Sequence, residues 1–80
     1  MTPADRARVV IAQHLGLPIT AIVDDAALVA DLGADSLDRY ELAVLLEDNF
    51  HLEFDNDAIA ELHTVADVIA FVEKAMGAIS

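Results

Sequence analysis

The chain has 80 residues, of which 56% are hydrophobic, and its formal net charge is -11. A chain of this length buries only about 60% of the surface that its unfolded form exposes, so it has room for one small core and little room for an enclosed active site. The hydrophobic fraction is too high for a disordered chain, and the apolar runs are far shorter than the roughly 18 residues of a membrane span. We expect one soluble globular domain, residues 1–80, with no membrane insertion.

The net charge, the lack of cysteine and the N-terminal stretch limit which partners and which cellular compartment are expected. Fifteen acidic residues oppose four basic ones, which argues against nucleic acid or an anionic membrane as partner and favours proteins with basic surfaces. The absence of cysteine excludes disulfides and thiolate metal sites. The N-terminal stretch MTPADRARVV carries charges where a secretory signal would have an uninterrupted apolar run, and we therefore expect a cytoplasmic protein.

The first predicted helix begins after Thr2 and stops at Gly16. Thr2 suits the capping position, Pro3 suits the first turn, and Asp5 places an acid near the positive end of the helix dipole. Its predicted apolar face comprises Val9, Val10, Ala12 and Leu15. The connection that follows, residues 17–33, contains turn residues and also six large aliphatic residues, Ile19, Ile22, Val23, Leu28, Val29 and Leu32. Because these side chains gain from burial, we expect this long loop to be structured and to pack on the core.

The second predicted helix runs from Asp35 to about Phe50. Asp35 and Asp38 stand three residues apart, as in a capping box. At about 100° per residue, one sector of this helix faces the core and holds Leu42, Ala43, Leu46 and Phe50. The opposite sector is a second apolar stripe, Leu37, Tyr40 and Val44, flanked by Glu41, Glu47 and Asp48. An exposed apolar stripe of this kind indicates a docking surface; the alternative is that Tyr40 and Val44 lie buried under the preceding loop.

Two further helices complete the chain. A short one is predicted from about Asp57 to Leu62. Thr64 and Asp67 cap a final helix that ends at Gly77. Its residues at the spacing of one helical face are Val65, Val68, Ile69 and Val72. The predicted fold is all-α, a small bundle of three main helices plus one short helix, with a long structured loop between the first and second helices.

Ser36 is the residue of the second helix that most suggests chemistry. Since Asp35 fills the capping position, Ser36 falls in the first turn with its hydroxyl towards solvent. The three histidines, His14, His51 and His63, lie on other segments or at the far end of the same helix, so the sequence shows no base that would make Ser36 a nucleophile. An exposed serine without its own activating group suits a substrate of another enzyme.

The residues around Ser36 resemble a known family. The run DLGADSLDRYEL, followed by LEDNF and TVADVIAFV, is similar to the discrete acyl carrier proteins of fatty acid and polyketide systems, and the similarity covers almost the whole chain. The resemblance implies that Ser36 Oγ, flanked by Asp35 and Leu37, receives phosphopantetheine from coenzyme A through a separate transferase. The thiol of that arm then holds acyl intermediates as thioesters, and the chain is a carrier, not an enzyme.

The resemblance also implies two surfaces. A monomeric carrier would dock on basic patches of the phosphopantetheinyl transferase and of acyl-processing enzymes, such as synthases, reductases and acyltransferases, through Leu37, Asp38, Arg39, Tyr40, Glu41, Val44, Glu47 and Asp48. An acyl chain would be shielded between helices by candidates for a pocket lining, Leu28, Val29, Leu46, Phe54, Ile59, Leu62, Val68 and Phe71. Arg39, Tyr40, His51 and Phe54 are less usual in the family, so a carrier dedicated to a specialised lipid or secondary metabolite is weighed equally with one for fatty acid synthesis.

Other functions are weighed against this one. A peptidyl or aminoacyl carrier has a similar bundle and an equivalent serine, and the acidic second helix favours acyl groups only modestly. A calcium loop in DNDAIAELHTVA fails, because Ile59, Ala60 and Ala66 occupy positions that need a ligand, a glycine and a glutamate. The histidines lack zinc-ligand spacing, so no metal site is predicted, although weak divalent binding at clusters such as Asp31, Asp35 and Asp38 stays open. An interaction module that is never modified is the remaining alternative.

Overall fold

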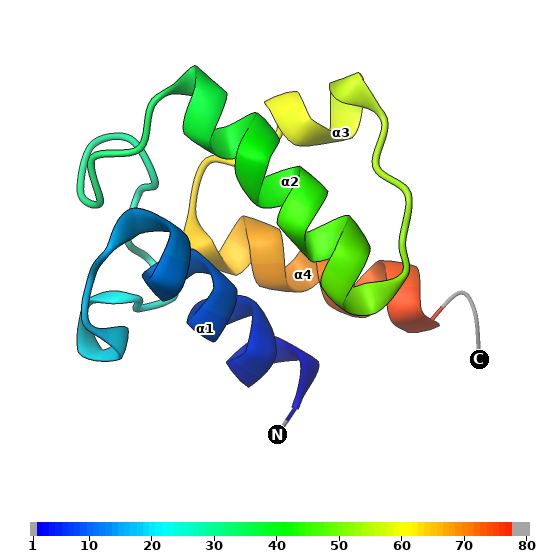
Figure 1. The fold of residues 1–80 in the computed structure, drawn as a ribbon, viewed down its shortest axis with the longest axis horizontal. Coiled ribbons are helices and arrows are strands. Elements are labelled where there is room, and N and C mark those ends of the chain that lie inside the picture. The colour runs from blue at the N-terminus through cyan, green and yellow to red at the C-terminus, as the bar shows by residue number, and fades with distance from the viewer. Residues whose placement is uncertain (1, 78–80) are drawn as a thin grey trace.

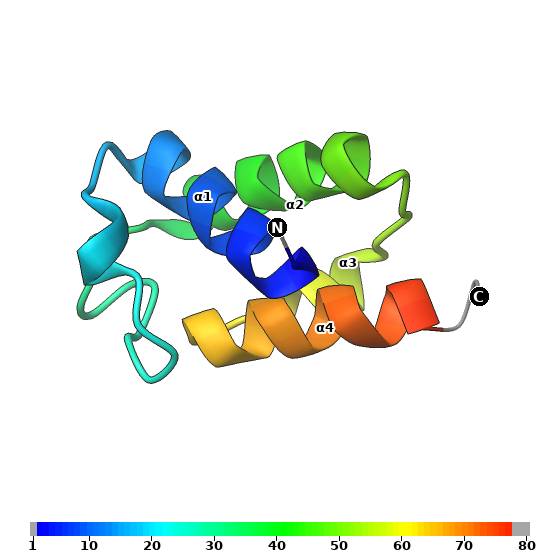
Figure 2. The same ribbon diagram turned by 90° about the horizontal axis from the view of Figure 1, so that it is seen from below.

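Four α-helices and one short 3₁₀ helix make up the regular structure of residues 2–77, the part of the chain that the computed structural model describes. In chain order they are α1 (Pro3–Leu15), η1 (Ile19–Ala21), α2 (Ser36–Phe50), α3 (Asn56–Ala60) and α4 (Val65–Gly77). Helix α1 packs against both α4 and α2, and α2 also contacts α3 and α4 (Figure 1). Figure 2 shows α2 and α4 along opposite sides of the bundle, with α1 in front of them. The predicted arrangement of three long helices and one short helix is confirmed.

The predicted helix ends follow from local hydrogen bonds. Thr2 Oγ1 accepts a bond of 3.1 Å from the backbone N–H of Asp5, and Gly16 closes α1 in the left-handed region at φ 67°, where glycine carries no Cβ penalty. At the start of α4, Asp67 N–H donates to Thr64 Oγ1 and Thr64 N–H donates to the Asp67 carboxylate. The predicted caps of both helices are confirmed.

The core is built mainly from α1, α2 and α4. Helices α2 and α4 bury the sets predicted for them, Leu42, Ala43, Leu46 and Phe50 on α2 and Val65, Val68, Ile69 and Val72 on α4. The predicted face of α1 is partly wrong, because Val9 and Leu15 are only half-buried and Ala7 and Ile11 are fully buried. The apolar face of α1 is therefore centred on Ala7 and Ile11, and this face packs against both α2 and α4.

The loop between α1 and α2 packs on the core through only some of its aliphatic residues. Ile22 and Leu28 are buried and Leu32 is partly buried. The expectation is wrong for Ile19, Val23 and Val29, which are about half exposed. Buried and exposed positions have no regular period here, because the chain turns repeatedly and side-chain direction follows the local backbone.

Backbone hydrogen bonds attach this loop to the N-terminus of α4. Leu28 N–H donates to the His63 carbonyl at 2.9 Å, and Val65 N–H donates to the Ala26 carbonyl at 3.1 Å. The Arg8 guanidinium pairs with the Asp24 carboxylate from the side of α1. The loop is thus held at both α1 and α4, which determines where α2 begins.

Helix α3 begins slightly earlier than predicted. It runs from Asn56 to Ala60, so the predicted range of about Asp57 to Leu62 extends two residues too far at its end. Its N-cap is Asp55, whose Oδ1 accepts a 2.7 Å bond from Ala58 N–H. Before it, the ring of Phe54 meets that of Phe71 on α4 edge to face, with centroids 4.6 Å apart. None of the helices in residues 2–77 combines the length and apolarity needed to cross a lipid bilayer.

Candidate functional site

Ser36 is the first residue of α2, and its side chain is exposed. The capping box before it is confirmed: Asp38 N–H donates to Asp35 Oδ1 at 2.8 Å, and Asp35 N–H donates to Asp38 Oδ2 at 3.0 Å. The two aspartates that flank Ser36 therefore bond to each other's backbone. This arrangement satisfies the helix terminus without the serine hydroxyl, which is left for chemistry.

The chain reaches Ser36 through a tight turn. Gly33 has φ 76°, in the left-handed region that favours glycine, and its N–H donates to the Val29 carbonyl. The next residue, Ala34, is buried, and its N–H donates to the Leu28 carbonyl at 2.9 Å. A buried alanine just before the helix places the Asp35–Ser36 segment at a defined position on the surface. The positive φ of this turn thus explains why a glycine occupies its position in the LGADSL motif.

The second apolar stripe of α2 is exposed. Leu37, Tyr40 and Val44 have exposed fractions of 65%, 45% and 55%. The alternative that Tyr40 and Val44 lie buried under the loop is therefore wrong. We call the surface formed by these three residues and the adjoining Glu41, Glu47 and Asp48 the docking strip.

The charged residues of the strip differ in their surroundings. Glu41 and Asp48 are exposed, whereas Glu47 is half-buried and its carboxylate accepts a 3.1 Å bond from Phe54 N–H. Glu47 therefore holds the segment between α2 and α3 against α2, and it also contributes charge to the strip. Arg39 is half-buried, and its Nε is a buried atom without a hydrogen-bond partner. Asp38 is half-buried and belongs to the capping box.

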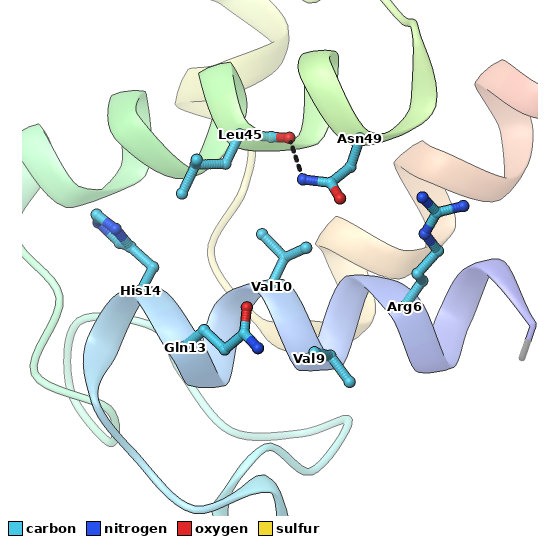
Figure 3. A pocket seen from close by; sticks show the side chains of 7 residues that line it. All are labelled: Arg6, Val9, Val10, Gln13, His14, Leu45 and Asn49. Atoms are coloured by element: carbon cyan, nitrogen blue, oxygen red, sulfur yellow. Dashed lines mark hydrogen bonds between the residues drawn. The ribbon is translucent and has the colours of Figure 1, made fainter.

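His14 reaches α2 from the end of α1. Its Nε2 lies 3.4 Å from Asp38 Oδ1 and 3.3 Å from Glu41 Oε2. Figure 3 shows the ring pointing from α1 towards α2, at one end of a groove of about 490 Å³ between the two helices. Reasoning from sequence missed this cluster, because His14 is distant along the chain from Asp38 and Glu41, and no local spacing indicates their contact.

The predicted lining of an acyl pocket is mostly interior. Leu28, Leu46, Ile59, Leu62 and Val68 are buried. Phe54 and Phe71 are partly buried in contact with each other. Val29 is 55% exposed and lies on the surface, contrary to its predicted place. A surface groove of about 330 Å³ is lined by two of the predicted residues, Leu62 and Phe71, together with Glu61, Asp67, Ala70 and Lys74.

The geometry at Ser36 suits a phosphoester. The N-terminus of an α-helix has unpaired N–H groups and the positive end of the helix dipole, which stabilise a negative phosphate. The carboxylates of Asp35 and Asp38 oppose this effect, but both accept backbone hydrogen bonds that offset part of their charge. The site can therefore bear a phosphate on an exposed side chain.

Known proteins similar to this chain also carry a phosphopantetheine attachment site or are acyl carrier proteins. The family model described as the phosphopantetheine attachment site matches residues 5–72. An acyl carrier protein of Akkermansia muciniphila is 40% identical over 73 residues, which are 91% of this chain and 91% of that protein.

Two solved structures share the fold. An acyl carrier protein from Thermotoga maritima has a TM-score of 0.81 at 24% identity, covering 94% of this chain and 87% of that one. The solution structure of the oxytetracycline acyl carrier protein has a TM-score of 0.76 at 20% identity, covering 100% of this chain and 86% of that one. With the matched family model and the Akkermansia relative, the conclusion is that this chain belongs to the acyl carrier protein family, in which a covalently attached phosphopantetheine arm carries acyl groups.

Proposed function

We propose that Ser36 Oγ is the atom that bears the phosphopantetheine arm. In the loading reaction a new bond forms between Ser36 Oγ and the phosphorus attached to the pantetheine of coenzyme A, and adenosine 3′,5′-bisphosphate leaves. The proton of the hydroxyl passes to a base of the transferase. The observation that supports this assignment most strongly is the exposure of Ser36 at the first position of α2, within a capping box of Asp35 and Asp38 that does not use the serine hydroxyl.

We propose the docking strip as the surface that the transferase and the acyl-processing enzymes contact. Its three exposed apolar side chains offer area for burial, and the carboxylates beside them would attract basic patches on the partners. Electrostatic attraction of this kind speeds association more than it tightens a complex, which suits a carrier that must leave each enzyme. In this account Asp38, Arg39 and Glu47 act at the edge of the strip, since each is half-buried.

The acyl chain itself would be sheltered among the buried residues between α2, α3 and α4. Leu46, Leu62 and Val68 are the central candidates, and the Phe54–Phe71 contact stands at the periphery. The short α3 contacts α2 through few residues, so we propose that α3 moves to admit the chain. We further propose that the protein is a monomeric, single-domain, cytoplasmic carrier without catalytic activity of its own; one continuous core joins its long helices.

Loading by a transferase tests the attachment site. The chain has two serines, Ser36 and Ser80, which supplies a matched pair of variants. With coenzyme A, Mg²⁺ and a broad-specificity phosphopantetheinyl transferase, intact-protein mass spectrometry should show one added phosphopantetheine on the parent chain and on Ser80→Ala. Ser36→Ala should show none, while its circular dichroism and melting temperature match those of the parent. A loaded Ser36→Ala protein would refute the assignment.

A further inference from the structure

The cluster of His14, Asp38 and Glu41 is a set of metal-ligand atoms from two helices. His14 Nε2, one oxygen of Asp38 and one of Glu41 all lie within 4.8 Å of one another. Within residues 2–77, no other group of three histidine or carboxylate residues meets this criterion. His14 and Asp38 are half-buried, and Glu41 is exposed, so the cluster has one side open to solvent.

His14 Nε2 faces two carboxylates without a hydrogen bond to either. This nitrogen is a buried atom without a hydrogen-bond partner, and it faces two carboxylate oxygens at 3.3 and 3.4 Å. A bare lone pair pointing at two anions would be repelled by both. A metal ion placed between the three atoms would accept the nitrogen lone pair and attract both carboxylate oxygens.

The two separations from His14 Nε2 match the edges of a metal coordination sphere. Zinc binds imidazole nitrogen and carboxylate oxygen at about 2.0–2.2 Å in tetrahedral geometry, which separates neighbouring ligand atoms by about 3.3–3.6 Å. The two distances from Nε2 fall at that separation. An ion bound to Nε2 would therefore find one oxygen of each carboxylate at the distance of a neighbouring ligand, and the ligand atoms of the cluster all lie within 4.8 Å of one another.

We propose that His14, Asp38 and Glu41 bind one Zn²⁺ ion, with water completing the coordination. The imidazole ligand favours zinc over Mg²⁺ and Ca²⁺, which prefer sites made of oxygen ligands alone. This proposal replaces the expectation of no metal site, which considered spacing along the chain and not contact between α1 and α2.

The capping box orients one of the ligands. Asp38 Oδ2 accepts the N–H of Asp35, and this bond directs the other oxygen, Oδ1, towards His14. Hydrogen bonds from outside the coordination sphere commonly hold metal ligands in this way. The ion would also connect the end of α1 to the first turns of α2, and it would neutralise Asp38, near Ser36, and Glu41, a residue of the docking strip.

Calorimetric titration of the untagged chain with ZnCl₂ at pH 7 tests the site. We expect one ion per chain, and at least a tenfold loss of affinity in His14→Gln. His63→Gln is the matched control, because His63 is an exposed histidine outside the cluster, and it should bind zinc like the parent. Titration with MgCl₂ should show no difference between the parent and His14→Gln.

A second variant and a spectroscopic measurement distinguish loss of a zinc ligand from an effect on folding. Glu41→Gln removes a charge from an exposed ligand, and it should also weaken zinc binding while its melting temperature in EDTA stays that of the parent. Zinc should shift the NMR signal of His14 Nε2 more than those of the other histidine ring nitrogens. Equal zinc affinity of the parent and His14→Gln, or a shift centred on another histidine, would overturn the proposal. None of these measurements involves loading of Ser36, so they test the metal site independently of the attachment site.

Discussion

The two apolar faces of α2 have similar composition and different surroundings. One face is buried against α1, α3 and α4 and consists of Leu42, Ala43, Leu46 and Phe50. The other is exposed along the same helix and consists of Leu37, Tyr40 and Val44. Burial stabilises the fold only for the first face, whereas large side chains gathered in water indicate contact with something outside the chain. Apolar periodicity therefore locates a face of a helix, and the elements packed against that face decide whether it stabilises the fold or is free for recognition.

Truncating one residue on each face should separate the two roles most strongly. Leu46 is fully buried, so Leu46→Ala should lower the free energy of unfolding by about 2–5 kcal/mol, a large part of the stability of so small a domain. Val44→Ala, two positions earlier on the exposed face, should change it by no more than about 0.5 kcal/mol. Urea unfolding followed by circular dichroism measures both. Similar losses in the two variants would erase the distinction between the faces.

Tyr40→Ala tests what the exposed face contributes. As an aromatic anchor, Tyr40 should contribute about 1 kcal/mol or more to a complex with an acyl-processing enzyme. The variant should therefore bind such an enzyme at least fivefold more weakly, while its unfolding curve stays close to that of the parent. Affinity is measured by calorimetry with holo protein. A melting temperature lowered by several degrees would instead place Tyr40 among the residues that hold the fold.

The N-terminus of α4 belongs to neither face of α2, and a change there should have a smaller effect on the free energy of unfolding. A hydrogen bond from the Thr64 backbone is the main cause that lowers the pKa of Asp67 from its ordinary value of 3.8. Because the pKa is lower in the folded state, the carboxylate stabilises the fold fully above about pH 5, and this contribution disappears as the pH falls through the folded pKa. Asp67→Asn should cost about 1 kcal/mol at pH 7 and progressively less below pH 4.

The difference between parent and Asp67→Asn, measured by urea unfolding from pH 7 to pH 3, isolates this group from the other acids. Thr2→Ala serves as a control, since it removes the cap hydroxyl of α1, which does not titrate, and leaves Asp67 and its hydrogen-bond partners intact. A difference that stays constant across this range would show that the charge of Asp67 contributes nothing.

Local signals explain what the sequence could predict. Asp35 with Asp38 and Thr64 with Asp67 each make hydrogen bonds within three residues, so the starts of α2 and α4 depend on neighbours along the chain. Helical periodicity likewise identified the buried face of α2, because a regular helix turns each residue by a constant angle. The prediction of an exposed Ser36 follows from the same local geometry.

Contacts between distant segments explain the rest. His14 meets Asp38 and Glu41 only because α1 packs on α2, and the sequence has no periodic pattern that indicates it. The aliphatic side chain of Val29 suits a pocket lining, but the irregular backbone before Gly33 turns it to solvent. Glu47 has a second role for the same reason: its bond to Phe54 N–H depends on how the chain returns after α2.

Fragmentation mass spectrometry of the loaded parent protein tests the central claim most directly, because it identifies the residue that carries the arm. After loading and proteolysis, we predict that phosphopantetheine is found on Ser36 alone, in the peptide that spans the start of α2. Phosphopantetheine on any other hydroxyl, whether Ser80, a threonine or Tyr40, would contradict the account, because the account assigns the arm to the first residue of α2, beside the docking strip.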